Sequence, residues 1–175
     1  MVSKKVKDFL RSGEMHMEFE YKGDKNAASE WHRLRNPLRV VLNAIIIYFC
    51  MFIPSLRIKR GLYRLLGTKI GKNVVIAPEV LLDPIFPELI ELKDNSIIGW
   101  GTKILTHEFT TKTTRIGRVK IGENTVVGAF SVVRCGVEIK EDCVVAMMSL
   151  VHKDIESFEL VGGVPEHEIR KLEKV

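Results

Sequence analysis

Residues 121–151 read IGENTVVGAFSVVRCGVEIKEDCVVAMMSLV, and this stretch decides the fold. Every sixth position in it holds an aliphatic residue, namely Ile121, Val127, Val133, Ile139, Val145 and Val151. Two earlier blocks keep the same period, with Ile70, Ile76 and Leu82 in one and Leu92, Ile98 and Ile104 in the other. Neither a helix, with a period of about 3.6, nor a simple alternating strand gives a strict period of six. The pattern therefore predicts a parallel β-helix built from hexapeptide repeats.

Layering explains the period. Each hexad forms a short strand and a corner, and its aliphatic residue points inward onto the equivalent residue of the next coil. The fourth residue after each aliphatic should also point inward near a corner, so it should be small; most positions agree, and the exceptions are Phe86, Glu108 and Ile155. Glycines follow the aliphatic at four positions, where we expect them to let the backbone bend: Gly71, Gly99, Gly122 and Gly128. A β-sandwich with a chance period is the alternative, and six unbroken hexads disfavour it.

The chain divides into four segments. Residues 1–35 are polar and basic, and we expect short helical pieces or a mobile arm there. Residues 36–67 form an apolar and amphipathic helical segment, and residues 68–160 form the repeat region, from which residues 109–120 should extrude as a loop. Residues 161–175 are expected to form a turn and a short C-terminal helix.

Composition and charge narrow the environment. The three cysteines, Cys50, Cys135 and Cys143, have no metal or redox spacing, which favours reduced thiols in a reducing compartment. Residues 1–69 carry a net charge of +8 and residues 70–175 one of −3, which together give +5. The apolar run begins near residue 40, too late for a signal peptide, so none is expected.

Two interpretations of residues 37–66 stay open. Val40–Leu56 contains no charged residue and is flanked by basic clusters on both sides, Arg33, Arg35 and Arg39 before it and Arg57, Lys59 and Arg60 after it. The helices could lie on a membrane surface with the basic residues toward anionic headgroups. They could equally pack under the β-helix or against a partner subunit. A full membrane span is the least favoured reading, because seventeen residues is the lower limit of length.

His107 is the main candidate for chemistry. It lies in ILTHEF, three residues after the inward Ile104 and directly before the expected loop. A rigid repeat body with a loop over its flank is a setting in which catalytic groups occur. A neutral imidazole there can take a proton from a hydroxyl or an amine as that group attacks an acyl carbon. A solvated surface histidine is the alternative.

From about Ile70 to Leu172 the chain resembles the hexapeptide-repeat acyltransferases, in particular the maltose, galactoside and xenobiotic O-acetyltransferases and the surface-polysaccharide acetyltransferases. The resemblance rests on IGKNVVIAPEV, DNSIIGWGTKILTH, IGENTVVGAFSVVRCGVEI, SLVHKDI and GGVP. It implies a left-handed parallel β-helix, a handedness that departs from the usual right-handed crossover. It also implies a homotrimer with active sites between subunits and acetyl-CoA as the acyl donor.

The resemblance assigns roles to individual residues. It places the catalytic base on His107, which would deprotonate an acceptor hydroxyl. Its coenzyme A contacts fall on late-coil and C-terminal residues, namely Ala129, Met147, His152, Lys153, His167 and Arg170. The acceptor-side polar group falls on Asp83, for which a turn residue before Pro84 is the favoured alternative. Glu108 is a candidate to orient His107, although neighbouring strand residues point to opposite faces. Trp100 is expected at an interface or in surface packing.

The resulting hypothesis is a trimeric acetyl-CoA-dependent O-acetyltransferase acting on a sugar or glycan-like acceptor. We expect no metal cofactor and no nucleic-acid partner. The expected location is cytoplasmic, at the inner face of the membrane if residues 37–66 bind lipid. A non-enzymatic trimeric scaffold is one alternative. A γ-class carbonic anhydrase is another, disfavoured because the repeat region holds only His107 and His152, too far apart to suggest a zinc site.

Overall fold

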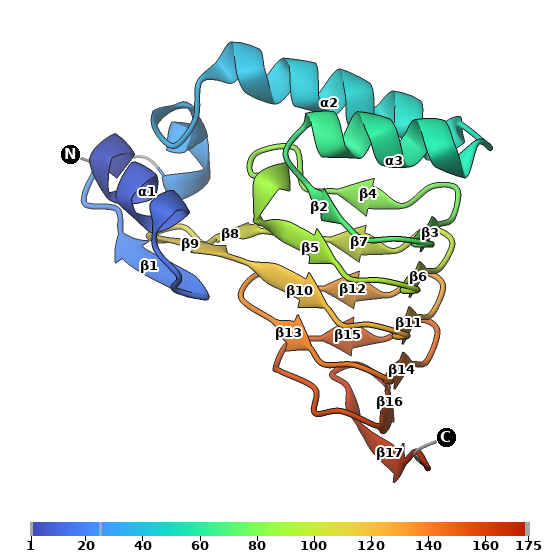
Figure 1. Ribbon diagram of the computed structural model, residues 1–175. Helices are drawn as coiled ribbons and strands as arrows, with labels where there is room; N and C mark the ends of the chain where they lie inside the picture. Colours follow the sequence, from blue (N-terminus) through green and yellow to red (C-terminus); the bar gives the residue numbers. More distant parts are fainter. Residues whose placement is uncertain (1, 25, 174–175) are drawn as a thin grey trace.

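The computed structural model describes residues 2–24 and 26–173 and contains a parallel β-helix with helices across one end (Figure 1). Its strands stack into three faces. The first face holds β2 Lys69–Ile70, β5 Ile90–Leu92, β10 Val119–Ile121 and β13 Glu138–Ile139. The second face holds β3 Val75–Ile76, β6 Ile97–Ile98, β11 Val126–Val127, β14 Val144–Val145 and β16 Glu159–Gly162. The third face holds β4 Leu81–Leu82, β7 Lys103–Ile104, β12 Val132–Val133 and β15 Leu150–Val151.

The predicted inward ladder is confirmed. All of the aliphatic residues that set the period are buried, the most exposed being Ile70 at 9%. They stack in register, since Ile104 pairs with Val133 and Val133 with Val151 in neighbouring parallel strands. Each methyl-bearing side chain therefore contacts its equivalents above and below, which is how a narrow repeat core excludes water.

The corners of the β-helix depend on two kinds of residue, of which the sequence analysis named only the glycines. The glycines after the ladder residues are needed for close stacking: a Cβ on Gly128 would lie 2.5 Å from the backbone nitrogen of Met147 in the next coil. Left-handed backbone at other residues makes the bend. One corner uses Asx residues, which adopt this conformation readily. They have φ values of 54° to 58° and form a side-chain hydrogen-bond ladder in the order Asn73, Asn95, Asn124 and Asp142.

The prediction that residues 109–120 form an irregular extruded loop is wrong, because most of this segment forms strands. Two strands, β8 His107–Phe109 and β9 Thr113–Gly117, form an antiparallel hairpin, and β1 His16–Glu20 pairs with the outer edge of β9. The Thr-rich sequence explains this result, because β-branched residues favour extended backbone. Pairing with β1 also covers what would otherwise be an open edge.

Residues before the β-helix are folded against this hairpin. They form α1 Val2–Arg11, β1 and the 3₁₀ segment η1 Ala27–Arg33. A second apolar cluster joins them to the β-helix side, and its buried members include Phe9, Leu34, Phe86 and Ile116. Phe86 belongs to the irregular first break of the repeat, next to the short 3₁₀ turn η2 Pro87–Leu89. The N-terminal segment thus forms one wall around the hairpin that carries His107.

Two helices, α2 Pro37–Phe52 and α3 Leu56–Leu65, lie across the N-terminal end of the β-helix (Figure 1). Among the described residues no single helix is long and apolar enough to cross a bilayer, and only η1 with α2, bent by 101°, passes such a test as a pair. The inner side of α2 packs on the β-helix, where Ile47 and Cys50 join its core. The inner side of the segment 37–66 therefore packs on the β-helix, as one of the two interpretations predicted.

Side chains of helix α3 donate hydrogen bonds to the unpaired backbone carbonyls at the open end of the β-helix. Backbone N–H groups of the first coil bond to carbonyls of the second, as Ala77 N does to Ile98 O, so first-coil carbonyls point outward with no coil beyond them. The Lys59 ammonium, on a side chain only 1% exposed, donates to the carbonyls of Ile76 at 3.2 Å and Ala77 at 3.1 Å. Arg64 donates to the Ile70 carbonyl at 2.8 Å. Cationic side chains suit this end because it presents acceptors only.

We expect Lys59→Met to lower the free energy of unfolding by about 2–4 kcal/mol. The variant keeps the apolar stem but leaves two buried carbonyls without a donor, and each such loss costs about 1–3 kcal/mol. Urea denaturation followed by circular dichroism measures the change. Arg57→Met, on an exposed position of the same helix, is the matched control and should stay within about 0.5 kcal/mol of wild type. Equal stability of the two variants would contradict the capping role.

The short C-terminal helix predicted within residues 161–175 is wrong for the part that the structure describes. Residues His167–Lys171 form strand β17, which pairs antiparallel with β16. Residues 174–175 lie outside the described residues. The last strand of the second face would otherwise expose unpaired backbone groups, and pairing with β17 outweighs the helix propensity of Glu, Lys and Arg.

Candidate active site

His107 is held by a buried carboxylate. The Asp83 side chain is fully buried, and its Oδ2 lies 2.5 Å from His107 Nδ1. The other interactions of this carboxylate fix its position: Oδ2 accepts from Thr106 N and Oδ1 accepts from Ile85 N, both at 2.8 Å. Because an ionised carboxylate only accepts hydrogen bonds, Nδ1 carries a proton whether the ring is neutral or charged, and in the neutral ring Nε2 has a free lone pair.

Opposing effects act on the pKa of Asp83. Burial alone would raise it, because a charged carboxylate is poorly solvated inside a protein. The hydrogen bond and charge of His107, together with the N–H groups of Thr106 and Ile85, outweigh burial and hold the pKa of Asp83 below its usual range. Asp83 is therefore ionised at neutral pH and can stabilise a positive charge on His107.

The fold brings these two residues together through its register. Leu82 pairs with Ile104, so Asp83 follows the ladder in the first coil directly above the segment that leads to His107. The sequence analysis placed Asp83 on the acceptor side or, preferably, in a turn before Pro84. The hydrogen bond from Ile85 N to Oδ1 is the one expected of such a turn, and Oδ2 of the same buried carboxylate also holds Thr106 N and His107 Nδ1. The carboxylate that orients His107 is that of Asp83.

Glu108 has a different partner. Its carboxylate receives two hydrogen bonds from Arg134, at 2.6 Å from Nε and 2.5 Å from Nη2. The Arg134 hydrogen bond, opposed by burial, holds the pKa of Glu108 below its usual range. The sequence-based suggestion that Glu108 orients His107 is therefore wrong. The ring contact of His107, whose side chain is 20% exposed, is instead with Phe109 at a centroid distance of 5.0 Å.

A second histidine–carboxylate pair lies further along the same corner. His152 Nδ1 is 2.6 Å from Glu166 Oε2, and the Glu166 side chain is almost fully buried. Val151 stacks two coils below Ile104, so His152 lies about 10 Å along the β-helix axis from Leu105, at a coil spacing of about 4.8 Å. The exposed Lys153 follows it. Sequence reasoning missed Glu166, although its place directly after the GGVP turn was visible.

The remaining candidate coenzyme residues lie at other corners. Ala129 and Met147 stack at the corner between the second and third faces, since Met148 N bonds to Ala129 O. His167 pairs with Gly162 in β17 and so lies at the bottom of the same corner. The third face therefore separates Ala129, Met147 and His167 from His107, His152 and Lys153. Trp100, half-exposed, lies above Phe130 at the corner of Ala129.

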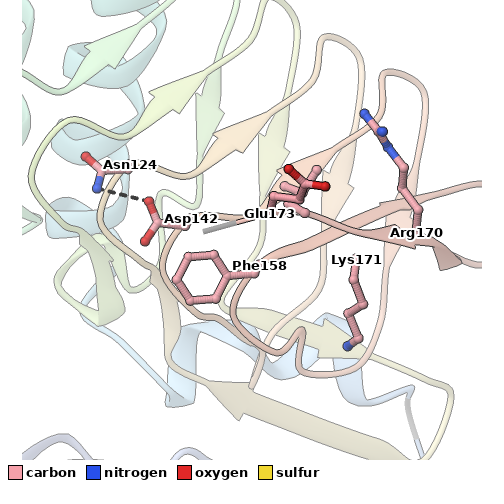
Figure 2. A pocket seen from close by; sticks show the side chains of 7 residues that line it. Asn124, Asp142, Phe158, Arg170, Lys171 and Glu173 are labelled. Atoms are coloured by element: carbon pink, nitrogen blue, oxygen red, sulfur yellow. Dashed lines mark hydrogen bonds between the residues drawn. The ribbon is translucent and has the colours of Figure 1, made fainter. Parts of the chain in front are cut away.

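Arg170 lies apart from both groups. It lines a hollow of about 650 Å³ at the corner of the Asx ladder, together with Phe158, Lys171 and Asp142 (Figure 2). Figure 2 shows the Arg170 and Lys171 side chains leaving β17 in opposite directions. This hollow does not include the Asp83–His107 pair, so its size does not mark the reaction centre.

Residues 2–24 and 26–173 contain no group of three or more His, Cys, Asp or Glu side chains placed to hold a metal ion. Cys50, Cys135 and Cys143 are all unpaired and buried. Burial raises the pKa of Cys50 to about 11 and that of Cys135 to about 12. These thiols stay protonated at neutral pH and are poor nucleophiles.

A β-helix that holds a histidine against a buried aspartate at one corner is suited to proton transfer. Comparison with known proteins identifies the family to which this β-helix belongs. The family model for the bacterial transferase hexapeptide (six repeats) matches residues 118–153. YvoF of Bacillus subtilis (strain 168), whose name assigns it to the acetyltransferases, is 40% identical over 142 residues, which cover 79% of this chain and 83% of YvoF.

Solved structures show the same fold. The galactoside acetyltransferase in complex with coenzyme A is 19% identical, with a TM-score of 0.67 over 96% of this chain and 91% of that one. The hexapeptide-repeat acetyltransferase VCA0836 of Vibrio cholerae O1 biovar eltor, complexed with acetyl coenzyme A, is 20% identical, with a TM-score of 0.63 over 78% and 88%. The chain belongs to the hexapeptide-repeat acetyltransferase family, and its fold is the left-handed parallel β-helix.

Proposed function

We propose that this protein transfers an acetyl group from acetyl-CoA to a hydroxyl of a sugar or glycan-like acceptor, with His107 as the general base. The Asp83–His107 pair is the observation that carries the proposal. The fully buried Asp83 carboxylate fixes the ring of a partly exposed histidine, which leaves Nε2 available to an acceptor hydroxyl. Membership of the acetyltransferase family supplies the reaction class, and the galactoside acetyltransferase of like fold supports a sugar acceptor.

The chain's own residues supply the proton chemistry. His107 Nε2 accepts the proton of the acceptor hydroxyl as its oxygen attacks, and a general base of this kind accelerates such steps by about 10² to 10⁴-fold. Asp83 holds Nδ1–H and stabilises the imidazolium that results. The pair Glu108–Arg134 limits the movement of the strand that carries His107. When bound, acetyl-CoA would supply the thioester carbonyl that the acceptor oxygen attacks. The carbon–sulfur bond would then break, and coenzyme A would leave as a thiol with the proton that His107 returns.

The candidate coenzyme residues fit a site shared by two copies of the chain. Cations suited to phosphates occur at Lys153 and Arg170, and His167 can donate a hydrogen bond to a phosphate. The small Ala129 leaves space beside the corner for an extended thiol arm. In one chain, however, Ala129, Met147 and His167 lie across the third face from His107 and His152. An assembly that brings this corner of one copy to the His107 corner of the next would unite the two sets. We therefore include a homotrimer in the proposal.

The direct test is release of free coenzyme A thiol from acetyl-CoA by the purified protein. A panel of mono- and oligosaccharides serves as acceptors, and their deoxy analogues identify the hydroxyl that reacts. The proposal requires acceptor-dependent thiol release. Failure across hydroxyl acceptors together with turnover of amino sugars would replace O-transfer by N-transfer, and no turnover at all would favour the non-enzymatic scaffold. Size-exclusion chromatography with light scattering measures the mass of the assembly and so tests the trimer.

We expect Asp83→Asn to lower kcat for acetyl transfer by about tenfold or more with little change in KM. The amide cannot stabilise the imidazolium, whereas the buried side chain touches no substrate. Steady-state kinetics across pH checks this, because a positioning role should also shift the pH profile. Glu108→Gln is the matched control: it weakens the contact to Arg134 and leaves the Asp83–His107 pair intact. A larger loss in Glu108→Gln than in Asp83→Asn would contradict this assignment.

A further inference from the structure

The outer side of α2 is apolar and uncovered. Its inner stripe, which includes Ile47 and Cys50, packs on the β-helix. The opposite stripe recurs at helical spacing, and each of its side chains is 51% to 73% exposed: Leu38, Val41, Leu42, Ile45, Tyr48, Phe49 and Phe52. Ile58 and Leu65, on the neighbouring α3, are also exposed. We call these nine residues the outer stripe.

The two helices that carry the outer stripe have basic but no acidic side chains, although Glu79 lies next to Met51 at the end of α2. Residues 31–78 contain nine Lys or Arg residues and no Asp or Glu, so neither α2 nor α3 carries an acidic side chain. Arg39 lies on α2 between stripe residues, and Arg57 is exposed at the start of α3. Neither has a carboxylate within ion-pair distance among the described residues. Arg39 and Arg57 therefore leave uncompensated positive charge at the edge of the outer stripe.

A basic hollow adjoins the first turn of α2. It has a volume of about 360 Å³. Its lining includes the cations Lys7, Arg33, Arg35 and Arg39, together with His32 and the apolar Val6, Leu10 and Leu34. Glu30 pairs with Arg33 and Glu88 pairs with Arg35, so those two charges are compensated. Lys7 and Arg39 have no such partner in the described part of the chain. A phosphate group at this place would meet unpaired cations beside an apolar surface.

We propose that the outer stripe docks on an anionic lipid surface, with the apolar side chains in the acyl region and the basic residues at the headgroup phosphates. Apolar side chains on one side of a surface helix and cations at its edges are what such a surface binds. The helices that carry the stripe, α2 and α3, lie at the end of the β-helix opposite β17 (Figure 1). Docking would therefore leave the His107 corner at the side of the molecule, open to an acceptor near the membrane.

The test is co-sedimentation of the full chain with vesicles of equal parts phosphatidylglycerol and phosphatidylcholine, against pure phosphatidylcholine. We expect binding to the anionic vesicles at low salt and weaker binding at high salt, because ions screen surface charges. The double substitution Ile45→Glu with Phe49→Glu should reduce the affinity by about tenfold or more. Arg39→Gln and Arg57→Gln should each reduce it by about fivefold, and only on anionic vesicles.

Ile169→Glu is the matched control, since Ile169 is similarly exposed at the opposite end of the molecule, and it should bind like wild type. Wild-type protein that stays in the supernatant with anionic vesicles at low salt would overturn the proposal. So would an outer-stripe variant that binds undiminished. A fall in oligomer mass in that variant, with no vesicle binding by wild type, would assign the stripe to a second copy of the chain. Acetyl transfer to a soluble acceptor should be unchanged in the outer-stripe variant, so this test is independent of the proposed enzyme activity.

Discussion

Val133→Asp should abolish soluble folded protein. Val133 is fully buried in the third face, between Ile104 above and Val151 below. A carboxylate there would meet only methyl groups, and an unpaired buried charge costs several kcal/mol or forces protonation. Since a folded domain is stable by only about 5–15 kcal/mol, the cost approaches the whole stability. Expression, circular dichroism and thermal melting measure the loss.

Val132→Asp is the matched control, because it introduces the same carboxylate one residue away on the same strand. Successive strand residues point to opposite faces, so the Val132 side chain points away from the core. This variant should stay folded, with a far-UV spectrum like that of wild type. If Val133→Asp melted like wild type, the assignment of inward and outward positions along the repeat would be incorrect.

His107→Ala should lower the rate of acetyl transfer by about 10²-fold or more while the protein stays folded. The loss of rate follows from the loss of the general base. The fold should survive because the His107 side chain lies outside the inward ladder and is partly exposed. Turnover of acetyl-CoA with a sugar acceptor gives the rate, and the melting temperature confirms that the variant is folded.

His152→Ala provides the comparison, since His152 also pairs with a buried carboxylate but lies about two coils, or roughly 10 Å, from the segment that carries His107. If His107 is the base, His152→Ala should change KM for acetyl-CoA more than kcat. A wild-type rate in His107→Ala, or a collapse of kcat in His152→Ala alone, would move the proposed base from the first histidine to the second.

The sequence predicted part of the candidate site. His107 followed from its place after Ile104, and its role followed from a family resemblance. Asp83 was singled out and its turn before Pro84 was anticipated, but its contact with His107 was not, because an insertion between Leu82 and Leu92 breaks the period and makes the coils hard to count. The sequence did not reveal that Leu82 pairs with Ile104 in the neighbouring coil. With that register, Asp83 falls directly above the residues that lead to His107.

The sequence by itself determined the inward ladder of the β-helix. Each coil repeats the same environment, so a residue such as Val133 reveals its orientation through the period alone. Tertiary structure decided what the period does not encode. The edge of β16 made a strand of residues 167–171, which have helix-forming composition, because unpaired backbone groups at a sheet edge gain hydrogen bonds.

The same division holds for the N-terminal segment. The uncharged run in α2 is apolar on both sides, so its composition could not tell which side is buried. Only the placement of α3, with Lys59 on the first-coil carbonyls, fixed the helices across the end of the β-helix and left the opposite side of α2 exposed. A repeat coil ends in acceptors that need donors from elsewhere, and which donors reach them depends on contacts distant in sequence.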